Sequence, residues 1–165
     1  MGLAALLTYV SLGRRRIDYR FILLGAILPD VVDQIAMIFV DEPSGRWIGH
    51  SLTAVLAASV FVIVVFSGER RLALFGLAVG WLLHLVGDGI WQSPETFFWP
   101  AFGTDFAVTP EEPYSWDLFR SPWDHGWSWA GEVAGAAVLG WFIVAFRLNQ
   151  HDRFRLFLKD GYLRP

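Results

Sequence analysis

A histidine and an aspartate four residues apart, His84 and Asp88, are the only ionisable side chains in the apolar segment 72–92. On an α-helix, positions i and i+4 lie on the same face, so the imidazole and the carboxylate would project side by side. Together these groups can coordinate a divalent cation. In an apolar environment an ionisable group without a partner is costly, so this pair predicts further polar partners elsewhere in the chain.

Three more ionisable residues lie in apolar segments. Asp30 and Asp33 are the only charged residues of the segment 21–40, and both follow Pro29. Proline interrupts a helix but suits the first turn of a new one, so the two aspartates are expected one turn apart where a new helical piece begins. His50 lies near the start of the next apolar segment. These three residues are the candidate partners of the histidine–aspartate pair.

The composition is that of a membrane protein. Of the 165 residues, 55% are hydrophobic and 18% are charged, whereas a water-soluble domain has about 25% charged residues. The absence of cysteine excludes disulfides and thiolate metal sites. The net charge of −3, without a basic patch, argues against nucleic acid as a partner.

Apolar segments separated by polar turns predict an all-α, polytopic integral membrane bundle that forms a single domain over 1–165. Four full spans are expected, together with a short N-terminal helix over 1–13 that is either partial or belongs to a fifth span. As a helix this N-terminal stretch would reach about 20 Å, against a hydrocarbon core of about 30 Å. Residues 93–124, rich in proline and aromatic residues, are expected to form an interfacial loop, and 147–165 a polar tail. The four expected spans are 21–40, 47–68, 72–92 and 126–146.

The distribution of basic residues predicts the orientation. If the loops after Gly13 and Gly68 share one side with the C-terminal tail, that side collects eleven of the thirteen basic residues. The basic side is expected to be cytoplasmic, which places the C-terminus in the cytoplasm. The loops 41–46 and 93–124 then face outward.

This topology brings the five ionisable residues into the outer half of the bilayer. Three carboxylates there would repel one another, and a divalent cation between them removes that conflict. Such a cation would also activate a bound water. Asp33 could act as a base instead of a ligand, and Arg46, near the outer mouth, could bind an anionic group of a substrate. The candidate metal ligands are Asp30, Asp33, His50, His84 and Asp88.

Each of these residues also has a structural interpretation. His84 could hydrogen-bond between helices, Asp88 could cap a helix, Asp30 could bind backbone donors after Pro29, and Arg46 could reach the lipid interface. The alternative function is therefore a non-catalytic membrane protein that uses the Asp/His cluster for ion or metal binding, or only for helix packing. The inner halves of the expected spans hold almost no polar residues, which argues against a transport path.

Three stretches, LLGAILPDVVDQI, GRWIGHSL and GWLLHLVGDGIWQSPETFFWPAFG, resemble in order and spacing the YdjM-like family of membrane-bound, predicted metal-dependent hydrolases. The resemblance covers roughly residues 15–106. HLVGD is also similar to the helical HxxxD of zinc-dependent phospholipase C, a shorter match. Many members carry a further histidine near the N-terminus, where this chain has Thr8 and Tyr9. The PD..D, HS and H...D signatures, regarded as metal-site motifs in the family, carry over to Asp30 and Asp33, to His50, and to His84 and Asp88.

The resemblance implies a metal-dependent hydrolase of the cytoplasmic membrane. Zinc is the expected cofactor, because imidazole and carboxylate ligands are combined. The expected substrate is an ester or phosphoester at the outer side of the membrane, such as a lipid headgroup, and membrane lipid is the expected partner.

Overall fold

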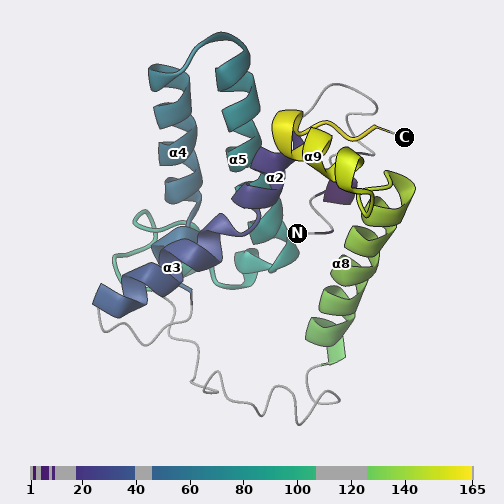
Figure 1. The fold of residues 1–165 in the computed structure, drawn as a ribbon. Coiled ribbons are helices and arrows are strands. Elements are labelled where there is room, and N and C mark those ends of the chain that lie inside the picture. The colour runs from purple at the N-terminus through teal and green to yellow at the C-terminus, as the bar shows by residue number, and fades with distance from the viewer. Residues whose placement is uncertain are drawn as a thin grey trace.

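The computed structural model describes residues 18–39, 46–106 and 126–164, together with five positions between residues 2 and 9. This part of the chain is all-helical and contains no strand, which confirms the all-α prediction (Figure 1). The elements are α2 (Tyr19–Gly25), α3 (Leu28–Phe39), η1 (Ile48–His50), α4 (Leu52–Val65), α5 (Gly68–Gly87), η2 (Ile90–Gln92), α6 (Pro94–Phe97), α8 (Gly126–Ala145) and α9 (His151–Asp160).

The segment 21–40, predicted as one span, is two helices. Helix α2 begins after Asp18, whose carboxylate accepts a hydrogen bond from the backbone N–H of Arg20, and it ends at Gly25. A short turn follows, and α3 starts at Leu28 with Pro29 in its first turn. Proline lacks a backbone donor and its ring clashes with the preceding turn, so the chain restarts the helix here.

The second predicted span, 47–68, is also shorter than expected. It opens with the 3-10 turn η1, which contains His50 and precedes α4. The Ser51 hydroxyl accepts a hydrogen bond from the N–H of Ala54 and donates one to the carbonyl of Ile48. This N-cap starts α4 at Leu52 and leaves it 14 residues long.

The prediction of four full spans is not supported. Among the residues whose side chains the structure describes, α5 is the one helix long and apolar enough, by length and composition, to cross a bilayer. Helix α4 has 14 residues, and α8 has 20, of which Val133–Ala145 is the apolar stretch with described side chains. Pro29 begins a new helix within the first predicted span, and the Ser51 N-cap begins α4 within the second, so the helices in both are shorter than predicted. Residues 41–45 of the predicted outer turn, 107–124 of the predicted loop and most of 1–13 lie outside the described residues.

Large apolar side chains cover the outside of the helices. In α4 these include Leu56, Val60, Phe61 and Val64, each at least half exposed. Contiguous apolar surface of this kind is rare on soluble monomers and marks contact with lipid or another protein. Helices α4 and α5, which lie side by side in Figure 1, therefore present a surface suited to a membrane.

The C-terminal segment, predicted as a polar tail, contains helix α9. The α9 end packs against the start of α2, where the Arg20 guanidinium donates to the carbonyl of Leu158 at 2.7 Å. The Tyr19 N–H donates to the carbonyl of Gly161 at 3.0 Å. These bonds tie the C-terminal helix to the N-terminal end of α2.

Helices α2 and α5 touch backbone to backbone. A Cβ at Gly25 would overlap the carbonyl of Leu77, and a Cβ at Gly80 would overlap the carbonyl of Ile22. Small residues permit such close approach between helices. The contact fixes the α2–α3 turn against α5, and so sets α3 relative to the end of α5.

We expect Gly80→Ala to destabilise the protein by about 1–3 kcal/mol, because a rigid carbonyl must move to admit the methyl group. Thermal unfolding in detergent should show a lower midpoint. Gly140→Ala in α8 is the matched control, since a Cβ there meets nothing within 4 Å. An unchanged midpoint in Gly80→Ala would show that the helices are not packed this closely.

Candidate metal centre

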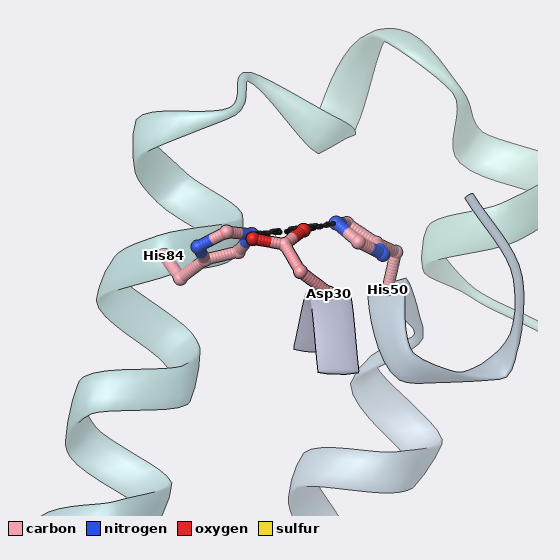
Figure 2. A group of neighbouring side chains, drawn as sticks. All are labelled: Asp30, His50 and His84. Carbon is pink, nitrogen blue, oxygen red and sulfur yellow. Dashed lines mark hydrogen bonds and ion pairs between the residues drawn. The ribbon is translucent and has the colours of Figure 1, made fainter. Parts of the chain in front are cut away.

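Side chains from three separate segments meet beside the start of α4. Asp30 comes from the first turn of α3, His50 from η1 and His84 from the last turn of α5. Figure 2 shows the Asp30 carboxylate between the two imidazole rings. One ligand atom from each residue lies within 4.8 Å of the other two.

The three ligand atoms form a nearly regular triangle. The His50 Nε2 and His84 Nε2 atoms are 3.3 Å apart. Asp30 Oδ1 lies 3.6 Å from His50 Nε2 and 3.5 Å from His84 Nε2. Ligand atoms bound tetrahedrally to zinc at about 2.0–2.2 Å are about 3.3–3.6 Å from one another. The spacing of these atoms therefore fits a divalent ion of that size.

The donor set favours a transition metal over calcium or magnesium. Calcium and magnesium prefer oxygen ligands throughout, whereas two imidazoles and one carboxylate suit zinc. The two imidazole nitrogens face each other, an arrangement that a shared cation makes favourable.

Asp88 and Arg46 lie at the edge of the same cluster. Asp88 is the residue after α5, and its Oδ2 lies 3.5 Å from His50 Nε2 and 3.6 Å from His84 Nε2. The Arg46 guanidinium is 3.6 Å from the same carboxylate oxygen. The predicted i, i+4 pairing of Asp88 with His84 is thus present, and the structure also brings Arg46 to this site.

Asp33 lies on the opposite side of His50. Its Oδ2 is 2.6 Å from His50 Nδ1, and its two oxygens accept hydrogen bonds from the N–H groups of Trp47 and Gly49 at 2.7 and 2.6 Å. A Cβ at Gly49 would press on the Pro29 carbonyl and on the Asp33 carboxylate, so glycine is required for this approach. Asp33 therefore supports His50 from behind.

Burial divides the cluster into a closed and an open side. The Asp33 and His50 side chains are 1% and 2% exposed, and that of His84 is 11% exposed. The Asp88 and Asp30 side chains are 32% and 53% exposed. A substrate could therefore approach from the side of the two exposed carboxylates.

The charges of the cluster favour a cation. Three carboxylates lie within a few ångströms of two imidazoles, and among the described residues the Arg46 guanidinium pairs with one of these carboxylates, Asp88. Like charges so close repel one another unless a positive charge lies between them.

Two supporting residues were not singled out from the sequence. The Trp81 indole N–H donates to the carbonyl of Gly49 at 2.7 Å and so fixes η1 against α5. Gly49 supplies both this carbonyl and the N–H bound by Asp33. Both residues fall inside the stretches that carry the family resemblance, but nothing in their type indicated this role.

The described part of the chain is all-helical, exposes apolar helices and carries an Asp/His group able to hold a cation, which fits the class of membrane proteins with a candidate metal centre. A model of the YdjM inner membrane protein family matches residues 1–154, and the chain belongs to this family. The match confirms the resemblance and indicates the inner membrane, while the family description names no activity. No curated protein and no solved structure matches the chain.

Proposed function

We propose that the protein is a membrane-bound, metal-dependent hydrolase whose zinc ligands are Asp30, His50 and His84. The observation that supports this most strongly is the triangle of ligand atoms, 3.3–3.6 Å apart, contributed by three separate segments. Catalytic zinc sites commonly use three protein ligands and leave one position open.

When bound, a divalent ion would increase the acidity of a water ligand and polarise an ester or phosphoester oxygen. Asp88 is placed to accept a proton, because its carboxylate borders the two imidazoles and is partly exposed. Asp33, the base predicted from the sequence, is buried and already accepts hydrogen bonds at both oxygens. We therefore assign the role of base to Asp88.

The proposed substrate is an ester or phosphoester at the outer face of the membrane, such as a lipid headgroup. Arg70 and Arg71 lie at the start of α5, and the metal cluster lies at its other end. With the basic end in the cytoplasm, the cluster opens outward and the C-terminus is cytoplasmic. The apolar helix surfaces beside the cluster suit a substrate that arrives from the bilayer.

The experiment is a hydrolysis assay on the detergent-purified protein loaded with zinc, using phosphodiester and phospholipid substrates. We expect turnover by the wild type that depends on zinc and is absent in Asp30→Ala. Zinc binding without hydrolysis of any substrate would support the non-catalytic alternative. Absence of zinc binding would contradict the hydrolase and would support a cluster that serves only helix packing.

Arg46→Met is expected to lower kcat/KM for an anionic substrate about tenfold to a hundredfold, because a charge-assisted hydrogen bond contributes about 1.5–3 kcal/mol. Zinc content should stay at the wild-type level, since Arg46 is not a proposed ligand. Arg70→Met, at the opposite end of α5, is the control and should hydrolyse at the wild-type rate. Equal kinetics in the two variants would exclude Arg46 from substrate binding.

A further inference from the structure

We propose that Asp33 is a positioning residue, which orients His50 for metal binding and does not itself ligate the ion. The proposal rests on the metal centre proposed above. It assigns different tasks to the two aspartates of the PDVVD stretch, Asp30 as ligand and Asp33 as support.

The hydrogen bonds of Asp33 set the tautomer of His50. A carboxylate only accepts hydrogen bonds, so the His50 nitrogen 2.6 Å away, Nδ1, carries the proton. In the neutral ring the other nitrogen, Nε2, then bears the lone pair, and it is this atom that faces His84 and Asp30. Metal-bound histidines usually donate their second N–H to a carboxylate or carbonyl in this way.

The Asp33 carboxylate is itself held in place. Besides His50, the N–H groups of Trp47 and Gly49 point at its two oxygens, and the side chain is almost fully buried. The η1 backbone is fixed from the other side by the Trp81 indole, which donates to the Gly49 carbonyl. Rotation of the His50 ring would therefore break its bond to Asp33 of α3, while α5 holds the η1 backbone in place.

Geometry separates Asp33 from the ligand atoms. Asp33 contacts Nδ1 of His50, whereas Asp30 lies near Nε2 of both histidines. The two nitrogens lie on different edges of the imidazole ring, so an ion bound at Nε2 is on the far side of the ring from Asp33. Asp33 therefore orients the His50 ring, and its negative charge acts on the proposed ion only through that ring.

The test measures the tautomer of His50 and the affinity for cobalt, used as a spectroscopic substitute for zinc. In the metal-free wild type, at a pH where the His50 ring is neutral, nitrogen NMR of histidine-labelled protein should show His50 protonated at Nδ1. In Asp33→Asn the amide can no longer accept all three hydrogen bonds, so the Nε2-protonated form should appear. Cobalt affinity should fall about 10–100-fold, the usual effect of losing an outer-shell partner. At saturation the variant should still bind one ion with the wild-type absorption spectrum.

Asp30→Asn and Asp152→Asn are the comparison variants. Asp30→Asn removes a ligand, so its cobalt spectrum should differ from that of the wild type. Asp152→Asn, on the exposed face of α9, should leave affinity and tautomer unchanged.

Three results would overturn the positioning role. These are a changed cobalt spectrum in Asp33→Asn, an unchanged affinity and tautomer in that variant, or a neutral His50 ring whose single proton is on Nε2 in the wild type. The tautomer measurement on the wild type needs no variant, so it tests the positioning role even if Asp33→Asn fails to fold. It also needs no metal, so it separates this inference from the proposed function. A wild type that binds no cobalt would contradict the hydrolase, whatever its tautomer.

Discussion

His84→Ala is expected to abolish stoichiometric zinc binding and to reduce hydrolysis to the background rate. The variant removes one of the three proposed ligand atoms and leaves Asp30 and His50, 3.6 Å apart, as the other two. The loss in affinity should exceed the 10–100-fold typical of outer-shell changes, since the change is in the coordinating group itself. Elemental analysis of the purified variant, together with the hydrolysis assay, measures both effects.

Two comparisons sharpen this prediction. His151→Ala replaces an exposed histidine of α9 and should retain wild-type zinc and activity. His84→Asn keeps hydrogen-bonding capacity but is a poor zinc ligand, so it should behave like His84→Ala. If His84 only joins helices through a hydrogen bond, His84→Asn would instead keep the wild-type properties.

Removal of the metal is expected to lower the thermal stability of the protein. An ion present at about 100 times its dissociation constant stabilises the folded state by about 2.7 kcal/mol. For a chain of this size each kcal/mol corresponds to about 2–4 °C, so chelation should lower the unfolding midpoint by about 5–10 °C. The physical cause is the repulsion between carboxylates of α3 and the end of α5 once the cation is gone.

Readdition of zinc should restore the midpoint of the wild type and have little effect on Asp30→Ala. Differential scanning fluorimetry in detergent measures the unfolding midpoints of the wild type and of Asp30→Ala, each with and without zinc. A zinc-induced shift of equal size in Asp30→Ala would place the ion elsewhere on the protein.

Local rules predicted much of the arrangement of the cluster. The spacing of His84 and Asp88 is a property of one helix, and the structure shows their side chains 3.6 Å apart. The helix restart at Pro29 also follows from the chemistry of one residue, and it places Asp30 in the first turn of α3. These features need no knowledge of the rest of the fold.

The separate surroundings of Asp30 and Asp33 depend on tertiary contacts. The N–H groups that surround Asp33 belong to residues 47 and 49, and the turn that presents them is held by Trp81 from a third segment. No periodicity in the sequence encodes these hydrogen bonds. For the same reason, the sequence pattern indicated the five residues of the cluster but not which of them are proposed metal ligands and which position another ligand.

The predicted number of spans is not supported for a related reason. Hydropathy measures how apolar a segment is, whereas helix length also depends on where a helix can begin. Pro29 and the Ser51 cap begin new helices inside segments that are apolar on average. In contrast, α5 has no internal start signal and keeps the length of a span.

X-ray absorption at the zinc edge tests the proposed coordination most directly. For the zinc-loaded wild type we expect one ion with a first shell of nitrogen and oxygen atoms at about 2.0–2.2 Å, including two imidazoles. In His50→Ala the bound ion should be lost or should retain a single imidazole. A wild-type shell without imidazole, or a spectrum that is the same in His50→Ala, would contradict a centre built from Asp30, His50 and His84.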